Sequence, residues 1–449
     1  MNQGEWEAAA PVLQPGEQAT GPHGTRLLSG WFTTGVRAGL AEHLAGYGPP
    51  PLPQTGRPAA ALIRAVDEAG LTGRGGAAFP TGRKLRTVAE ARGTAVVIAN
   101  GMESEAASRK DSTLLDVAPH LVLDGASLAA AAVGADEINL CLARTRGGQF
   151  QDLQAAVAER ARAGLDPVPI TLHGLPHHYV SSEETSLVNW LGSGEARPLS
   201  TPPRPFEKGV KGRPTLIDNV ETLAHLALIV RYGPDWFRSV GRPDAPGTSL
   251  VTLSGAVRTP GVYEVALGTT LAALVQTAGG ATRPLRALLI GGYFGSWLPA
   301  DQVQNLPYTK PDLATVGAGP GAGVLFALPD NGCGLSETAQ VIEYLARQSA
   351  QQCGPCRFGL PAVAADFATL AWGRPDAELV ARLRQRAGLL AGRGACRHPD
   401  GASRLAATAL DVFADDVHRH LTHQPCPGSR APRLLHVPDT PGPEQEGWR

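Results

Sequence analysis

The chain has 449 residues, of which 43% are hydrophobic and 18% are charged, and its formal net charge is −1. This length predicts roughly two to four domains, and the near-neutral charge excludes broad attraction to nucleic acid or to an anionic membrane. No apolar run reaches membrane-spanning length, since the longest is interrupted by Asp124. Residues 1–30 lack the basic and apolar regions of a signal peptide. We therefore expect a cytoplasmic protein, with any membrane association made through a partner.

Taken in chain order, the sequence predicts an N-terminal arm and lead-in over 1–57 and alternating helices and strands over 58–240. The stretch "AALIRAVDEAG" predicts a helix, and "GTAVVIANG" predicts a strand followed by a turn. The passage "RPLSTPPRPFEKGVKGRP" predicts an extended loop, because its prolines exclude regular structure.

The pattern changes over 241–330, where "SLVTLSGAVRTPGVYEV" predicts two strands around a turn and "TTLAALVQTAGG" predicts a helix. This segment resembles the small β-grasp domain called SLBB. Residues 331–423 predict an all-α region with amphipathic segments. The tail over 424–449 is rich in Pro and Gly, which predicts disorder.

The six cysteines are too few for a disulfide scaffold, so a cluster of them indicates metal binding or redox chemistry. Cys353 and Cys356 lie between two helical patterns, whereas a thioredoxin-type dithiol follows a strand. Cys396 comes later in "GRGACRHPDG", with His398 beside it, so iron–sulfur and zinc ligation both remain open. Two other cysteines fit ordinary buried positions: Cys141 and Cys333.

The stretch "CGPCRFG", with a lone cysteine further along, resembles the iron–sulfur region of the flavin-carrying, NADH-oxidising F subunit of respiratory complex I. Diaphorase subunits of hydrogenases and formate dehydrogenases share that pattern. The family motif C-G-x-C-x-P-C-R-x-G holds a [4Fe–4S] cluster with four thiolates. Aligned at the end of the motif, this chain has Ala350 in place of the first cysteine, and a gapped alignment also loses one ligand. The resemblance implies three ligands, Cys353, Cys356 and Cys396, and a [3Fe–4S] cluster or a [4Fe–4S] cluster with another fourth ligand.

The stretch "GRGGAAFPTGRKL", residues 73–85, resembles the family's G-R-G-G-A-G-F-P-T-G-x-K, which lines the FMN site, with Ala78 replacing a glycine. Residues without Cβ let a flat ring and a phosphate approach the backbone. The segments "NGMESE", "YVSSEETSL" and "KGRPTLIDNVETL" follow in the family's order. The resemblance implies these cofactor-binding residues: Gly73, Arg74, Gly75, Gly76, Phe79, Lys84, Asn100, Glu103, Glu105, Tyr179, Glu183, Glu184, Asp218 and Asn219.

The dinucleotide pocket departs further from the family. Thr87 stands where an aromatic residue is expected, and in "TPPR" Thr201 replaces a lysine and Arg204 replaces an aromatic residue. Arg204 could stack on adenine or pair with a phosphate, so we include it among the cofactor-binding residues. Glu105 and Glu184 remain as candidates beside the nicotinamide.

The resemblance implies an α/β fold with an FMN-binding Rossmann-like domain, then a β-grasp SLBB domain, then an all-α iron–sulfur bundle. It implies an enzyme that moves electrons from NADH or NADPH through FMN to an iron–sulfur cluster and a protein or quinone acceptor. The alternative is an electron-relay subunit that has lost dinucleotide binding and exchanges electrons with a ferredoxin-like partner. In either case we expect another electron-transfer subunit or a ferredoxin as partner.

Overall fold

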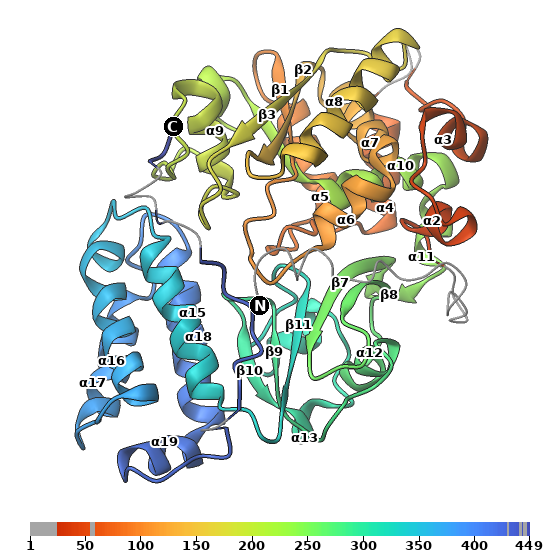
Figure 1. Cartoon of the computed structure of the whole chain (residues 1–449). Helices are drawn as coiled ribbons and strands as arrows, with labels where there is room; N and C mark the ends of the chain where they lie inside the picture. Colours follow the sequence, from red (N-terminus) through yellow and green to blue (C-terminus); the bar gives the residue numbers. More distant parts are fainter. Residues whose placement is uncertain (1–24, 54–58, 429–430, 440–441, 443–446) are drawn as a thin grey trace.

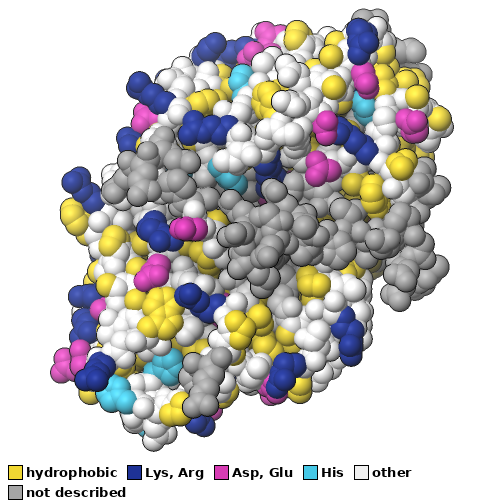
Figure 2. All heavy atoms as spheres, in the orientation of Figure 1, with side chains coloured by type: hydrophobic (Ala, Val, Ile, Leu, Met, Phe, Trp, Pro, Cys, Tyr) yellow, Lys and Arg dark blue, Asp and Glu magenta, His cyan; other side chains and the backbone are white. Residues whose placement is uncertain are grey.

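The computed structural model describes residues 25–53, 59–428, 431–439, 442 and 447–449. Figure 1 shows two sheet-containing domains and a helical domain. The predicted loose arm over residues 1–24 lies outside the described residues. In Figure 2, basic and acidic side chains of the described residues alternate over the visible face, in keeping with the net charge of −1.

The first domain contains a parallel sheet whose strand order is β3-β2-β1-β4. Its strands are β1 (Ala95–Asn100), β2 (Ala135–Ala143), β3 (Ile170–Leu175) and β4 (Thr215–Asn219). The helices around it are α4 (Ala59–Ala69), α5 (Thr81–Ala89), α6 (Lys110–Val117), α7 (Pro119–Val133), α8 (Gly147–Arg162), α9 (Glu184–Ser193), α10 (Val220–Tyr232) and α11 (Pro234–Arg238). β1 is buried along almost its whole length, as expected for a parallel strand covered on both faces.

The strand order places a topological switch point between β1 and β4. The chain leaves β1 toward β2 and β3 on one side, and β4 later pairs with the other edge of β1. Asn100 and Asn219 are register partners at the carboxyl ends of these two strands. Ligands of open α/β sheets bind outside the carboxyl ends of the strands at such a point.

Helices α7 and α10 pack in direct backbone contact beneath this sheet. A Cβ atom on Gly125 of α7 would lie only 1.9 Å from the carbonyl oxygen of Leu223 in α10, so this position accepts only glycine. The apolar run that Asp124 interrupts is thus a buried core helix. Among the described residues no single helix is long and apolar enough to cross a bilayer, and only the bent pair α6–α7 passes on combined length and composition.

The second domain contains a five-stranded sheet of order β10-β9-β11-β7-β8. Its elements are β7 (Thr248–Gly255), β8 (Gly261–Ala266), α12 (Leu271–Thr277), β9 (Leu285–Ile290), β10 (Ser296–Pro299), α13 (Ala300–Val303), α14 (Lys310–Ala314) and β11 (Val324–Pro329), preceded by the short hairpin β5 (Gly241–Arg242) and β6 (Ala245–Pro246). The two strands and the helix that the sequence predicts here are confirmed.

The helical domain consists of α15 (Gly334–Arg347), the π-helical turn η2 (Pro355–Gly359), α16 (Leu360–Trp372), α17 (Leu379–Leu390), α18 (His398–Val412) and α19 (Ala414–Leu421). The predicted all-α region is confirmed, and with it the predicted fold class. The Pro/Arg-rich passage before β4 is mostly loop, as predicted, but contains a 3₁₀ turn, η1 (Val210–Gly212).

The N-terminal lead-in is folded onto both sheet-containing domains. It forms α2 (Ser29–Thr34) and α3 (Leu40–Tyr47). The backbone amides of Arg26, Leu27 and Leu28 all donate to the carboxylate of Glu264 in β8. The Arg26 guanidinium donates to the carbonyl of Trp236 at 2.6 Å and lies over its ring.

The prediction of a disordered tail over 424–449 is wrong for the described part of that segment. Leu435 and Trp448 are buried, with 4% and 6% of their surface exposed. The amides of Leu434 and Leu435 donate to Glu337 of α15, and Ala196 donates to the carbonyl of Trp448. A Pro/Gly-rich composition disfavours helices and strands, but isolated apolar anchors can still fix such a segment by burial.

Candidate functional site

The glycine-rich loop that precedes α5 lies against the carboxyl end of β4. Gly76 has a φ of +107°, a conformation that favours glycine. A Cβ atom on Gly75 would lie 3.4 Å from the Cβ of Asn219, so the loop backbone lies close to the end of that strand. The Arg74 amide donates to Thr222 Oγ1 at 2.9 Å, which fixes the loop to α10.

Ala78 occupies the glycine position of the family's loop and has a φ of +48°. An L-residue with a Cβ costs about 1–2 kcal/mol in this left-handed region. We expect Ala78→Gly to raise the free energy of unfolding by about 1 kcal/mol, measured by urea denaturation. The neighbouring variant Ala77→Gly is the matched control, because Ala77 is not among the positive-φ residues and gains nothing from glycine. A stability gain at both positions or at neither would contradict this account.

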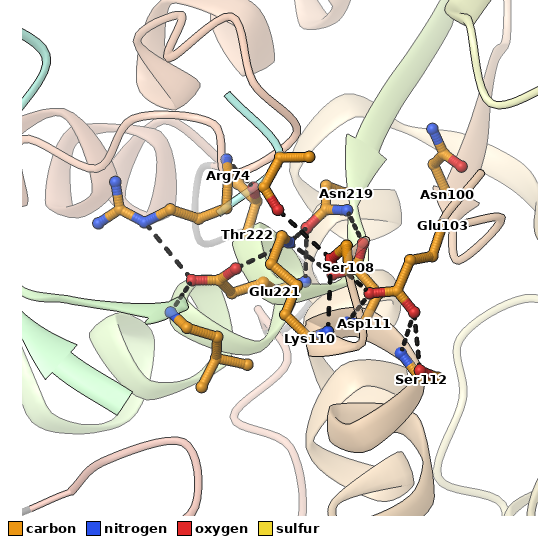
Figure 3. A network of polar contacts seen from close by, with 12 residues as sticks. Arg74, Asn100, Glu103, Ser108, Lys110, Asp111, Ser112, Asn219, Glu221 and Thr222 are labelled. Atoms are coloured by element: carbon orange, nitrogen blue, oxygen red, sulfur yellow. Dashed lines mark hydrogen bonds and ion pairs between the residues drawn. The ribbon is translucent and has the colours of Figure 1, made fainter. Parts of the chain in front are cut away.

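A network of buried polar groups lies under the loop (Figure 3). Lys110 donates to Asp111 at 2.6 Å and to Glu221 at 2.8 Å. Glu221 also accepts from the amide of Leu250 in β7, so the network crosses into the second domain. Asn219 accepts from Lys110 and donates to Asp111 at 2.7 Å. Both polar atoms of the Asn219 side chain are thus hydrogen-bonded to the start of α6.

The carboxylate of Glu103 is likewise bonded within the protein. It accepts from the hydroxyls of Ser108 and Ser112, from the amides of Asp111 and Ser112, and from Arg146. Burial alone would raise the pKa of Glu103, but Arg146 and these hydrogen bonds outweigh it and lower the pKa to about 2. Through these bonds Glu103 fixes the segment after Asn100 to the start of α6 and to Arg146.

A second group of charges lies at the end of β4. Lys84 of α5 donates to Glu184 at 2.9 Å, to the carbonyl of Ile217, and to Asp218 at 3.4 Å. Burial disfavours the charged lysine, but Asp218 and Glu184 more than compensate and raise its pKa to about 12. Asp218 Oδ2 is buried and has no hydrogen-bond partner among the described residues. The neighbouring Glu183 accepts from the amides of Thr185 and Ser186 and caps α9.

Glu105 and Tyr179 connect this region with the helical domain. The Tyr179 hydroxyl and the Tyr293 amide donate to Glu105, at 2.5 and 2.9 Å. Burial raises the pKa of Glu105 to about 7, although these hydrogen bonds oppose the shift. The Tyr179 ring lies 5.7 Å from the ring of His398, which starts α18. A carboxyl group poised near neutral pH in such a place is typical of a functional site.

The candidates for the dinucleotide pocket lie on the surface. Phe79 is 43% exposed, with the guanidinium of Arg83 5.6 Å from its ring centre. Arg204 is exposed, and its amide donates to Glu207. The structure therefore gathers Lys84, Glu184 and Asp218 around the end of β4 but leaves the two stacking candidates open to solvent.

Cys353, Cys356 and Cys396 lie close together at the start of η2 and before α18. Burial and the neighbouring thiols Cys353 and Cys396 raise the pKa of Cys356, and burial raises that of Cys396 to about 11. A bound metal reverses this effect, because a coordinated thiol is deprotonated. His398 Nε2 is hydrogen-bonded to the Leu345 carbonyl at 2.7 Å, so that nitrogen is not available as a zinc ligand.

The backbone favours the alignment that places Ala350 at the missing cysteine. Gln351 has a φ of +53°, and the family motif has a glycine directly after its first cysteine. This match holds only for the ungapped alignment. Ala350 is 9% exposed and lies in an apolar cluster with Trp448 of the tail.

Sequence reasoning missed the buried groups Lys110, Asp111 and Glu221, and the anchoring role of Trp448. The adjacent opposite charges in "SRKDSTLL", directly before an apolar helix, carry a signal for a buried ion pair. The position of Trp448 beside Ala350 depends on tertiary contacts, which the local sequence does not reveal.

Comparisons with known proteins agree with this geometry. The chain matches the models described as Nuo51 FMN-binding domain over residues 66–228, SLBB domain over 250–290, and NADH-ubiquinone oxidoreductase-F iron-sulfur binding region over 336–420. It is 31% identical to the F subunit of the NADH-quinone oxidoreductase of Streptomyces coelicolor, over 82% of this chain and 84% of that protein. It is 29% identical to the corresponding protein of Escherichia coli, over 79% and 83%.

The solved structures include a similar chain from an NAD⁺-reducing [NiFe]-hydrogenase in its H₂-reduced state. The two chains superpose with a TM-score of 0.78 at 30% sequence identity. The match covers 90% of this chain and 67% of the hydrogenase chain.

Proposed function

The chain belongs to the family of NADH-quinone oxidoreductase F subunits, and from this premise we propose that it oxidises NAD(P)H with FMN and an iron–sulfur cluster. A bound FMN would supply the conversion of a two-electron donor into single electrons for the cluster. The observation that carries the proposal is the meeting of the glycine-rich loop, Lys84 and an Asp218 oxygen at the switch point of the sheet. Within the described part of the chain this oxygen has no hydrogen-bond partner.

The residues present fit a flavin phosphate group and ring. Gly75 and Gly76 leave the backbone open where side chains would fill the space beside Asn219 and Gly321. Asp218 Oδ2 offers a buried acceptor that a ring N–H of the cofactor would satisfy. Lys84 keeps a positive charge at this point, because Glu184 and Asp218 stabilise its protonated form.

Glu105 and Glu184 have different tasks in this proposal. The carboxyl group of Glu105 is buried and holds or releases a proton near neutral pH, while Tyr179 orients it. Glu184 has a side chain that is 44% exposed, so it remains accessible to an incoming dinucleotide. Its hydrogen bond to Lys84 keeps it beside the loop.

The second cofactor would be held by the thiolates of Cys353, Cys356 and Cys396, whose soft donor chemistry suits an iron–sulfur cluster. The aromatic cluster of Tyr179, Phe294 and His398 packs between Glu105 and the segment of Cys396. This packing fixes the helical domain against the flavin region. We further propose that a separate electron-transfer subunit accepts the electrons from the cluster in the helical domain.

We expect the purified protein to release FMN on denaturation in a stoichiometric amount, and NADH or NADPH to bleach the bound flavin in anaerobic stopped-flow experiments. Lys84→Met should lower flavin retention, because it removes the buried charge beside Asp218. Lys208→Met, an exposed lysine, is the control that should retain flavin. A protein without flavin that also fails to take up added FMN would contradict the proposal. Flavin reduced by a ferredoxin but by neither dinucleotide would favour the relay function.

Because stacking residues are lost while Arg204 is gained, we expect weak dinucleotide affinity or a preference for NADPH, whose 2′-phosphate the guanidinium can pair with. A hydrogen bond to a charged group contributes about 1.5–3 kcal/mol, so Arg204→Ala should reduce the NADPH preference by roughly ten- to 150-fold. Arg204→Lys is the matched variant and should keep part of it. The measurement is the ratio of kcat/KM for the two dinucleotides. An unchanged ratio in Arg204→Ala would place Arg204 outside the pocket.

A further inference from the structure

A second group of metal-ligating side chains lies in the helical domain, away from the three thiols of the iron–sulfur site. Cys333, His420 and Cys426 bring their ligand atoms within 4.8 Å of one another. Cys333 Sγ lies 3.9 Å from His420 Nε2. Tetrahedral zinc with usual bond lengths holds such a sulfur and nitrogen about 3.5 Å apart, so the ligand atoms are already near their bound positions.

The imidazole of His420 is oriented for metal binding. Its Nδ1 lies 2.9 Å from the carbonyl oxygen of Leu370. A carbonyl only accepts hydrogen bonds, so Nδ1 carries the proton and Nε2 presents its lone pair to the thiols. An N–H donated to a backbone carbonyl in this way is the usual support for a histidine that binds metal through its other nitrogen.

The surroundings also suit a divalent ion. The thiols of Cys333 and Cys426 are buried, at 5% and 4% exposed, while His420 is half-buried. Two thiolates and one neutral imidazole balance a charge of +2, which suits a buried site. Asp416 lies one turn before His420 in α19, and its Oδ1 is buried and has no hydrogen-bond partner among the described residues. Its Oδ2 accepts from Arg286 at 2.6 Å.

This group is separate from the iron–sulfur ligands. Cys333 directly precedes α15, and Ala350 follows its other end. The helix has 14 residues, so its two ends lie about 20 Å apart. Figure 1 likewise shows α19 at the end of the helical domain that is distant from α9. Neither Cys333 nor Cys426 can therefore supply the missing fourth thiolate of the cluster.

We propose that Cys333, His420 and Cys426 bind a zinc ion, with water or Asp416 Oδ1 in the fourth position. Zinc is the divalent ion that sulfur and imidazole donors in a closed tetrahedral arrangement favour. The ion would join the start of α15, the end of α19 and the beginning of the tail. The proposal does not rest on the redox function, because it uses none of the residues assigned to flavin, dinucleotide or cluster.

The test is the metal content of the full-length protein, measured by inductively coupled plasma mass spectrometry on the form that also carries iron. We expect stoichiometric zinc in the wild type, and loss of zinc with iron retained in Cys426→Ser and His420→Gln. Cys141→Ala removes a buried thiol outside both groups and should keep its zinc. Cys353→Ser should lose iron and keep zinc.

A second measurement needs no variant and so does not depend on the folding of any. Zinc is removed from the wild type with a chelator, and Co²⁺ is added under reducing conditions, where a tetrahedral thiolate site gives intense visible absorption. Absorption that appears with Co²⁺ and disappears when zinc is returned supports the proposal. A wild type that contains no zinc and takes up no Co²⁺ would overturn it. Iron lost from Cys426→Ser, or a disulfide between Cys333 and Cys426 found by peptide mapping, would overturn it as well.

Discussion

A cysteine at position 350 is expected to convert the cluster of this protein from a three-thiolate to a four-thiolate form. With three thiolates, the wild type should show an electron paramagnetic resonance signal when oxidised, because an oxidised [3Fe–4S] cluster is paramagnetic. In Ala350→Cys that signal should disappear, a signal should arise only on reduction, and the iron content should rise. The left-handed conformation of Gln351 supports this placement, since it matches the glycine that follows the first cysteine of the family motif.

The matched control for this variant is Ala339→Cys. It adds a buried thiol to α15 more than two turns away and should change neither iron content nor spectrum. Cys356→Ser should remove the cluster altogether, because two thiolates do not retain it. If Ala350→Cys behaves as the wild type, the fourth ligand position lies elsewhere.

Lys110→Met is expected to lower the free energy of unfolding far more than the loss of an exposed lysine does. The Lys110 side chain is 3% exposed and neutralises Asp111 and Glu221. Removing it leaves the buried Asp111 without its cation and Glu221 with only Arg74, at 3.9 Å. Breaking a buried ion pair by removing one partner typically costs about 3–5 kcal/mol. The free energy of unfolding from urea titration is the measure, and Lys208→Met is the exposed control.

The loss in Lys110→Met should also depend on pH. Burial raises the pKa of Asp111 to about 6 even though Lys110 opposes the shift. Without Lys110 the pKa rises further, so the folded variant keeps this proton up to a higher pH than the wild type does. A carboxyl with a raised folded pKa stabilises less as pH rises through that value. The destabilisation should therefore be larger at pH 8 than at pH 5, and an equal loss at both would show that Lys110 acts through packing alone.

The sequence predicted the order and type of the domains because their patterns are local. Buried parallel strands such as β1 carry continuous apolar runs, and in the amphipathic helices apolar residues recur at the spacing of the helical turn. For the described part of the tail the prediction was wrong, because the order of that part depends on where Leu435 and Trp448 find buried contacts. Such contacts join residues far apart in the chain, and composition alone does not reveal them.

The candidate site was predictable where a motif fixes the backbone and less so where side chains form a network. The glycine-rich motif over residues 73–85 predicted both the loop that contains Gly76 and the place of Lys84 beside it. The sequence did not show that Glu103 and Asn219 would have their polar atoms bonded within the protein. It also did not reveal the approach of His420 to Cys333, because these residues are 87 positions apart in the chain.

The hydrogen bonds of Glu221 limit how this chain can be recombined with its relatives. Glu221 stands in the first domain, yet it accepts from Ser249 and the Leu250 amide of the second. The lead-in adds another tie through Glu264. A chimera that takes its second domain from another family member must preserve these contacts, or the buried Oε1 of Glu221 loses its hydrogen bonds at the junction. Crossover points after β8 should therefore yield folded hybrids more often than crossover points before β7.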